Sequence, residues 1–150
     1  MDFDLNIRYL ENSLPVDSPQ MKKIQACARE NNIVVALGFS ERHNNSLYIA
    51  QCTIDKTGEI VMKRRKMMPT HMERTVFGNS SGESLSNVAE TSVGKVGQLA
   101  CWEHVQPLLK YHTITQHEKI HVAAWPPVFP YAGPQELWSM TKEGENRRIA

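Results

Sequence analysis

Apolar positions along the chain alternate between helical spacing and short continuous runs. They recur at helical spacing from Met21 to Ala28 and mark one face of a helix. Ser18 can cap that helix, Pro19 suits its first position, and the pattern ends near Asn31. The first clear element that the sequence predicts is therefore an amphipathic helix over residues 19–31.

Apolar, β-prone runs predict the strands. The runs 33–39 and 120–125 are unbroken, which is typical of strands buried on both faces of a sheet. Asp55–Gly58 forms a turn between two neighbouring runs and predicts a hairpin. The predicted strands cover residues 33–39, 47–54, 59–65, 95–101 and 120–125.

The remaining segments complete an α/β pattern. Residues 104–116 are expected to form a helix, and residues 67–94, rich in Gly, Ser and Asn, a long ordered loop of the kind that is usually functional. We expect no confident element after Pro126. Helices alternating with buried strands and one hairpin indicate the α/β class with a mixed sheet, in a single domain spanning residues 1–150.

Composition narrows the classes of function. Apolar residues make up 41% of the 150-residue chain and charged residues 22%, which are globular values, and the net charge is +1. That charge balance gives no reason to expect nucleic acid or a membrane as a partner. There is no signal-peptide pattern or long apolar stretch, and the three cysteines are too few and too scattered for a disulfide framework. We therefore expect a cytoplasmic protein.

Cys101 occupies the most informative position in the chain. An apolar strand delivers it to the point where a polar, helix-prone segment begins, and such a junction favours a rigidly held thiolate. The arrangement is that of a nucleophile elbow, although G-x-S-x-G itself is not present. The alternative is that Cys101 is a small buried hydrophobe, which is the commoner fate of a lone cysteine.

Two motifs in order decide between these interpretations. Segment 65–74 reads Arg-Lys-x-x-Pro-Thr-His-x-Glu-Arg, and segment 97–103 reads Gly-x-x-x-Cys-Trp-Glu. With this spacing, the chain closely resembles the nitrilase branch of the carbon–nitrogen hydrolase superfamily. The resemblance implies a four-layer α-β-β-α sandwich and assembly into homo-oligomers. It extends through segments 8–14, 17–19, 106–112 and 121–127.

The resemblance also implies roles for individual residues. Cys101 would be the nucleophile, Lys66 would stabilise the developing anion, and Glu73 would support the lysine and help proton transfer. The reaction implied converts a nitrile to a carboxylic acid and ammonia through a thioimidate and an acyl-enzyme, with no cofactor. Trp102 and Glu103 are candidates for substrate binding; the alternatives are packing for Trp102 and a charge at a helix start for Glu103.

Other groups of charged residues and histidines indicate a function less strongly. The basic run 63–66 could be a solvated strand end or a targeting patch, and Glu73 with Arg74 could be a surface ion pair. Histidines 104, 112, 117 and 121 lack a carboxylate or second cysteine at ligand spacing, so we expect them to satisfy hydrogen bonds rather than bind a metal.

The match to the nitrilase pattern has gaps at both ends. Nothing before Arg8 resembles the strand that carries the general-base glutamate of the family, and residues 146–150 depart from the pattern. We therefore expect a domain that is incomplete at both ends and has little activity. Two alternatives stay open: a cyanide hydratase or amidase of the same superfamily, and a silent subunit that keeps only assembly contacts. His104 stands where cyanide hydratases tend to have Asn, which favours a nitrilase.

Overall fold

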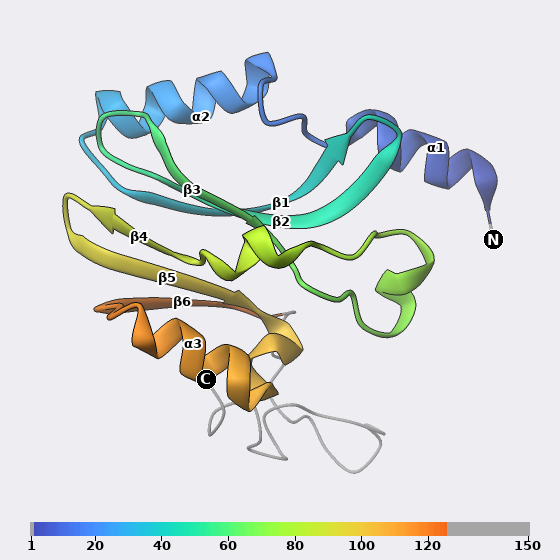
Figure 1. Cartoon of the computed structure of the whole chain (residues 1–150). Helices are drawn as coiled ribbons and strands as arrows, with labels where there is room; N and C mark the ends of the chain where they lie inside the picture. The colour runs from blue at the N-terminus through green and yellow to red at the C-terminus, as the bar shows by residue number, and fades with distance from the viewer. Residues whose placement is uncertain (1, 126–150) are drawn as a thin grey trace, which may run out of the picture.

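The computed structural model of the chain describes residues 2–125, which form four layers (Figure 1). Helix α2 covers one three-stranded sheet, and helix α3 covers the outer face of a second three-stranded sheet packed beneath the first. The α-β-β-α order implied by the sequence resemblance is thus confirmed. The elements are α1 Phe3–Asn12, α2 Pro19–Glu30, β1 Val35–His43, β2 Ser46–Ile54, β3 Ile60–Arg65, η1 His71–Thr75, η2 Gly82–Leu85, β4 Val88–Thr91, β5 Gly94–Ala100, η3 Cys101–Val105, α3 Pro107–Thr115 and β6 Ile120–Ala124.

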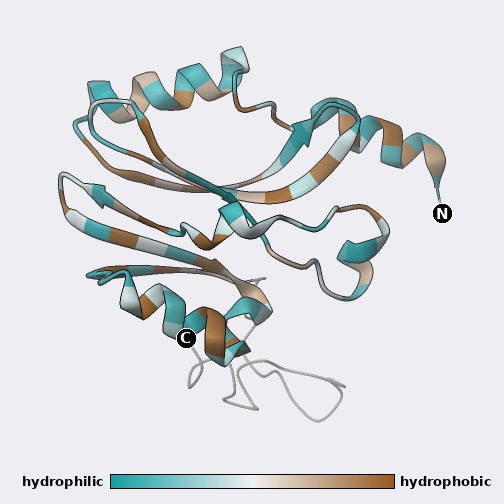
Figure 2. Ribbon diagram, in the orientation of Figure 1, coloured by the Kyte–Doolittle hydropathy of each residue, from teal (hydrophilic) through white to brown (hydrophobic). Residues whose placement is uncertain are grey.

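Helix α2, which the sequence predicts, covers the outer face of the first sheet. The Ser18 hydroxyl accepts the Met21 N–H at 3.2 Å and caps the helix, which starts at Pro19. Met21 and Ala28 are fully buried against Cys52 of β2. Figure 2 shows apolar and polar residues alternating along the strands, the pattern of sheets with one buried face.

Strands β1, β2 and β3 form an antiparallel meander, and the hairpin predicted at Asp55–Gly58 is confirmed. Gly58 has φ +82°, a left-handed conformation, and its N–H donates to the Asp55 carbonyl at 2.8 Å. A Cβ at this position would lie 2.7 Å from the carbonyl oxygen of Gln25 on α2. The turn is therefore closed by glycine and pressed against the helix.

The second sheet is mixed, with β4 antiparallel and β6 parallel to β5. Helix α3 supplies the crossover that a parallel β5–β6 pair requires. The sequence missed β4: residues 67–94 are not one long loop but hold η1, η2 and a four-residue strand, Val88–Thr91. A strand of that length carries too few residues to show a period of two.

Three further expectations about elements are corrected. Strands β1 and β6 are edge strands of the described sheets and alternate in exposure, so their predicted burial on both faces is wrong. The helix predicted at 104–116 is divided into η3 and α3 because Pro107 lacks an N–H and forces Gln106 into an extended conformation, with ψ 103°. The segment after Pro126 lies outside the described residues. Within residues 2–125 no helix is long and apolar enough to cross a membrane.

Polar side chains, not only apolar ones, join the two sheets. The Gln51 amide on β2 donates to the carbonyl of Leu99 on β5 at 3.2 Å. In return, the Gln98 amide on β5 donates to the carbonyl of Cys52 at 3.1 Å and to the hydroxyl of Thr53 at 2.7 Å. Because all of these groups are buried, each bond is made in a low-dielectric environment where an unpaired partner would be costly.

A buried ion pair completes this junction. The Arg64 guanidinium of β3 donates to both carboxylate oxygens of Glu103, at 2.8 and 2.7 Å, and the two side chains are 0% and 5% exposed. The same guanidinium donates to Gln51 Oε1 at 2.6 Å and to the Ser84 carbonyl at 3.2 Å. The first sheet, η2 and η3 are therefore tied to one cation.

Replacing Glu103 by Gln should destabilise the fold by about 3–5 kcal/mol, because the Arg64 charge would stay buried without a counter-charge. Urea unfolding followed by circular dichroism measures the loss. Glu90→Gln, an exposed carboxylate on β4, is the matched control. Equal stability of the two variants would contradict the importance of the pair.

Candidate active site

Cys101 lies at the sharp turn between β5 and η3, as the sequence predicts. Its backbone φ is 52°, in the left-handed region that non-glycine residues rarely occupy. Holding an L-residue there costs about 1–2 kcal/mol, so the surrounding contacts must enforce the turn. Cys101 is half-buried. The elbow inferred from the sequence is thus present in the backbone.

Glu103 and His104 hold this turn closed. The Glu103 carboxylate accepts the backbone N–H groups of Ala100 and Met67, at 2.8 and 2.9 Å, in addition to both bonds from Arg64. Each carboxylate oxygen of Glu103 thus accepts two hydrogen bonds from the chain itself. This geometry fits the helix-start alternative and offers no free lone pair for the substrate contact expected of Glu103. The His104 ring bonds through Nδ1 to the carbonyl of Cys101 at 2.7 Å.

The surroundings of Cys101 raise the pKa of its thiol, which is the direction opposite to that expected at a strand-to-helix junction. Burial raises the pKa of Cys101, and the nearby charges of Glu73 and Glu103 raise it further. The Lys66 charge and the Trp102 backbone N–H lower it, but not enough to reverse the direction. Because η3 is a 3-10 helix of only five residues, it supplies little helix dipole to offset burial.

Lys66 and Glu73 form an ion pair beside the elbow. Lys66 directly follows β3 and is 2% exposed; its Nζ donates to Glu73 Oε2 at 2.6 Å and to the Thr70 hydroxyl at 3.2 Å. Glu73 stands in η1, and its Oε2 also accepts the N–H of Thr70 at 2.7 Å and the Thr70 hydroxyl at 3.0 Å. Thr70, which the sequence did not single out, therefore links both charged groups.

This pairing fixes the charge of Glu73. Burial by itself would raise the pKa of the carboxyl, but the hydrogen bonds from Lys66 and Thr70 and the lysine charge bring it below its ordinary value. Glu73 is therefore a carboxylate at neutral pH. All of its bonds within residues 2–125 go to Oε2, so Oε1 can accept a further proton or hydrogen bond.

The structure brings the predicted trio into one neighbourhood. Both the Lys66 and the Glu73 charge act on the thiol of Cys101, and they oppose each other there. Trp102 is 41% exposed and lines a shallow hollow of about 280 Å³ that includes Thr70 and His71. Cys101, Lys66 and Glu73 do not line this hollow; it is the influence of both charges on the thiol that shows the three groups to be neighbours. The catalytic roles of these residues stay predictions.

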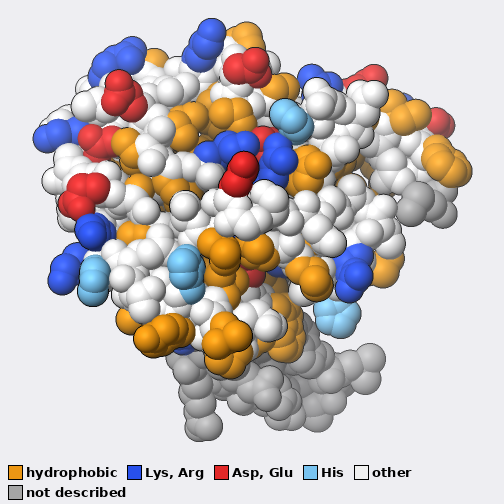
Figure 3. All heavy atoms as spheres, viewed as in Figure 1, with side chains coloured by type: hydrophobic (Ala, Val, Ile, Leu, Met, Phe, Trp, Pro, Cys, Tyr) orange, Lys and Arg blue, Asp and Glu red, His pale blue; other side chains and the backbone are white. Residues whose placement is uncertain are grey.

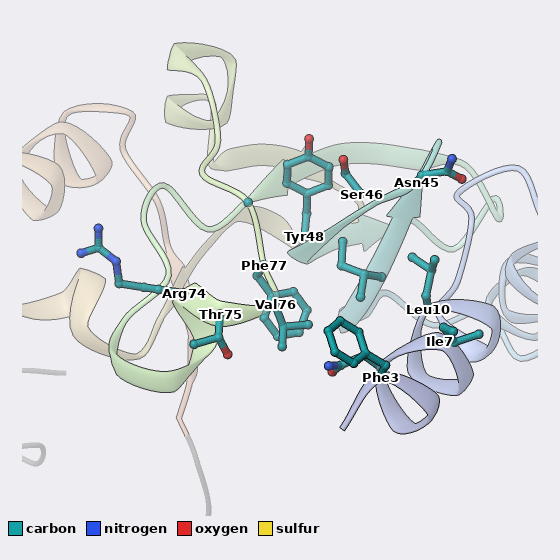
Figure 4. Close-up of a pocket in the computed structure, with 13 residues that line it drawn as sticks. Phe3, Ile7, Leu10, Asn45, Ser46, Tyr48, Arg74, Thr75, Val76 and Phe77 are labelled. Atoms are coloured by element: carbon teal, nitrogen blue, oxygen red, sulfur yellow. The ribbon is translucent and has the colours of Figure 1, made fainter. Parts of the chain in front are cut away.

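A larger hollow lies elsewhere. It measures about 560 Å³ and is lined by α1, residues 45–48 and residues 74–78. In Figure 4, Phe3 and Ile7 of α1 lie opposite Val76 and Phe77, which makes this hollow mainly apolar. None of the predicted catalytic residues lines it. Size alone would thus select a cavity without a nucleophile.

The basic run 63–66 alternates between two faces of β3 and its extension. Lys63 and Arg65 are partly exposed and both pair with Glu41, at 2.8 and 2.6 Å. Figure 3 shows a group of basic side chains with acidic ones beside it on one face of the molecule. Arg64 and Lys66 point inward and are buried. The period of two in this run was the signal that could have separated the buried cations from the exposed ones.

Three of the four histidines named in the sequence analysis, His104, His112 and His121, make side-chain hydrogen bonds, as predicted. His112 bonds to the Leu85 carbonyl at 3.1 Å, and His104 contacts His121 at 3.0 Å. His121 in turn contacts Glu118 at 2.8 Å, a carboxylate that the sequence analysis overlooked although it precedes His121 by three residues. Among residues 2–125, no three ligand-type side chains converge in a way that could hold a metal ion.

Two solved structures resemble this fold. A carbon–nitrogen hydrolase from Helicobacter pylori superposes with a TM-score of 0.72 at 21% identity, covering 98% of this chain and 48% of that protein. A mutant amidase from Nesterenkonia, solved with butyramide, superposes with a TM-score of 0.61 at 12% identity, covering 74% of this chain and 42% of the amidase. At such identities the likeness concerns the fold alone.

Sequence relatives are much closer. An arylacetonitrilase of Hypocrea virens is 62% identical over 144 residues, and one of Aspergillus niger is 61% identical over 144 residues. Each alignment covers 96% of this chain but only 44% and 43% of the relative, so the chain spans less than half the length of these enzymes. The sequence model of the carbon–nitrogen hydrolases matches residues 3–145. The chain therefore belongs to the carbon–nitrogen hydrolase family.

Proposed function

We propose that this chain carries the nucleophile of a nitrilase-type hydrolase that converts a nitrile to a carboxylic acid and ammonia. The observation that supports this most strongly is the half-buried Cys101 thiol on a left-handed turn, with the Lys66–Glu73 pair beside it. A nitrile carbon is a weak electrophile, so attack needs a polarisable nucleophile and a cation near the nitrogen. Cys101 at the start of η3 and Lys66 directly after β3 would supply these two groups.

The proposed reaction begins with attack of Cys101 Sγ on the nitrile carbon, which gives a thioimidate once the nitrogen gains a proton. A water molecule adds to this carbon, and ammonia leaves with the electron pair of the carbon–nitrogen bond. A second water molecule then cleaves the resulting thioester and releases the acid. The Lys66 ammonium would stabilise negative charge that develops on the substrate during addition.

A base is required because the thiol of Cys101 is protonated at neutral pH, given the upward shift of its pKa. We propose that Glu73 orients Lys66 through Oε2 and assists proton transfer through the unoccupied Oε1. The sequence resemblance implies a further base, a glutamate on a strand that nothing before Arg8 resembles. We propose that turnover is slow where Glu73 acts without that base.

The substrate class we propose is an arylacetonitrile. Relatives more than 60% identical are named for that activity. A second, mainly apolar hollow of about 180 Å³ supports it, because the aromatic residues Tyr9, Phe39 and Phe77 line it together with Ala100, the residue before the nucleophile. Aromatic walls suit an aryl group.

We also propose that the protein is cytoplasmic and homo-oligomeric. All three cysteines, which lie in the described part of the chain, are free thiols, in keeping with a reducing compartment. The outward face of α3 presents Leu108, Tyr111 and Ile114 at 84%, 67% and 55% exposure. An apolar stripe of this kind on a surface helix is typical of an interaction site, and a second copy of the chain is the partner we propose.

Incubation with phenylacetonitrile should modify Cys101 covalently and release ammonia and phenylacetic acid slowly. Peptide mass mapping locates the adduct, and chromatography identifies the product. Cys101→Ala should abolish both signals and Lys66→Met should lower the rate by about a hundredfold, the effect of losing one transition-state donor. Cys27→Ser, an exposed thiol, is the control. The absence of both adduct and ammonia would contradict the proposal, and so would phenylacetamide as the main product.

Alkylation of Cys101 by iodoacetamide should be slower at pH 7 than that of a free thiol and should accelerate as the pH rises above 9, because a raised pKa leaves little thiolate at neutral pH. Lys66→Met should slow the reaction further by removing the charge that lowers this pKa. Lys56→Met, in the exposed hairpin turn, should have no effect. A rate at pH 7 equal to that of free cysteine would rule out this environment.

Leu108→Lys should shift the protein toward a lower mass in multi-angle light scattering, because the charge would interrupt the apolar stripe of α3. Val93→Lys replaces another exposed apolar side chain, 57% accessible, away from α3 and serves as control. A monomeric parent chain, or equal masses for the two variants, would argue against assembly through α3.

A further inference from the structure

A line of hydrogen bonds runs behind the elbow and ends on the nucleophile's own backbone. Glu118 Oε2 lies 2.8 Å from Nδ1 of His121, and His121 Nε2 lies 3.0 Å from Nε2 of His104. His104 Nδ1 lies 2.7 Å from the carbonyl oxygen of Cys101. The segment that precedes β6, β6 itself and η3 are thus connected to Cys101 through side chains that the proposed chemistry does not use.

The acceptors in this line fix where its protons lie. A carbonyl oxygen can only accept, so His104 carries its proton on Nδ1. Burial lowers the pKa of His104, which leaves the ring neutral with Nε2 as an acceptor. His121 must then donate from Nε2, and one further proton is held between His121 Nδ1 and the Glu118 carboxylate. The one other arrangement without a clash would place a second proton on His104 Nε2 and leave that ring charged, which its burial disfavours.

Packing around the line is independent support. Gly97 on β5 pairs with His121 in the parallel register, and a Cβ at Gly97 would lie 1.8 Å from Glu118 Oε2 and 3.2 Å from Glu118 Cβ. Glycine is therefore required for Glu118 to lie over the strand. On the other side, Trp125 stacks on the His104 ring, with centroids 5.0 Å apart and planes inclined by 23°. His121, at Nε2, and the stacked Trp125 therefore both hold the buried ring of His104 in place.

We propose that Glu118, His121 and His104 act as a relay of positioning residues that holds the Cys101 carbonyl and, through it, the left-handed turn that presents the thiol. The relay rests on the proposed function only in taking Cys101 as the nucleophile. It assigns a role to Gly97 of the Gly-x-x-x-Cys stretch: to leave room for the carboxylate at the far end of the line. It also assigns His104 the tautomer that is protonated on Nδ1 and cannot donate from Nε2.

Nitrogen-15 spectra of the histidine-labelled chain test the tautomers directly. We expect His104 to be neutral and protonated on Nδ1, and His121 to be protonated on Nε2. A spectrum that shows His104 protonated on Nε2 would overturn the relay. So would a spectrum that changes on adding EDTA, because a metal ion bridging the two Nε2 atoms would then account for their approach.

Variants test whether the relay acts on the nucleophile. His104→Leu removes the donor to the Cys101 carbonyl, and Gly97→Ala displaces Glu118; both should loosen the turn, hydrate the thiol and speed iodoacetamide labelling of Cys101 by about fivefold, the factor that one hydrogen bond is worth. His104→Asn can still donate to the carbonyl and should restore near-parental labelling. His43→Asn, a histidine at the far end of β1, is the control.

The outcomes separate this inference from the proposed function. Labelling rates equal to the parent in both His104→Leu and Gly97→Ala, or equal acceleration in His104→Leu and His104→Asn, would overturn the relay. Circular dichroism establishes whether each variant is folded. If Gly97→Ala is unfolded, the nitrogen-15 spectra of the parent chain test the relay instead. A chain with the expected tautomers and labelling but no nitrile chemistry would keep the relay and contradict the proposed function.

Discussion

A buried ion pair between Arg64 and Glu103 holds the turn at Cys101 and the start of the segment after β3 in one arrangement. Taking both charges out of water is costly, and the geometry compensates with two direct bonds and further bonds to Gln51, Ser84, Met67 and Ala100. One carboxylate thereby anchors the end of β5, the start of η3 and the residue after Lys66. The position of the thiol relative to the ammonium follows from that anchor.

The electrostatics of the site reflect a balance between burial and charge. Lys66 is itself buried and paired with Glu73, so its effect on the thiol is partly cancelled by its own partner. Burial then decides the direction of the Cys101 pKa. A protonated resting thiol next to a fixed cation suits a nucleophile that is activated only when a base and substrate are both in place. The same burial protects the thiol from unproductive reactions.

Much of this arrangement could be predicted from local sequence. The cap at Ser18, the Asp55–Gly58 hairpin and the turn at Cys101 depend on a few adjacent residues, and all three are confirmed. The motif spacing placed Lys66 and Glu73 near each other. What failed depends on neighbours distant in sequence: the exposure of β1 and β6 is set by which strands lie beside them, and the short β4 exists because β5 pairs with it.

The polar contacts of the site were harder still to predict. Arg64 looked like one member of a solvated basic run, and Glu103 like a pocket residue, because a sequence does not show that a carboxylate is saturated by bonds from four groups. The only sequence signal for the role of Glu118 was its position three residues before His121. Such roles arise from register between β5 and β6, which places Gly97, Glu118 and His121 together.

The Arg64–Glu103 pair sets the turn that presents Cys101. This role can be measured as the alkylation rate of Cys101 in the double variant Arg64→Met with Glu103→Leu, which removes both charges and so avoids an unpaired buried ion. We expect a folded chain in which the two sheets still pack but Cys101 labels faster than in the parent. A folded double variant that labels at the parental rate would show that the pair does not set the turn.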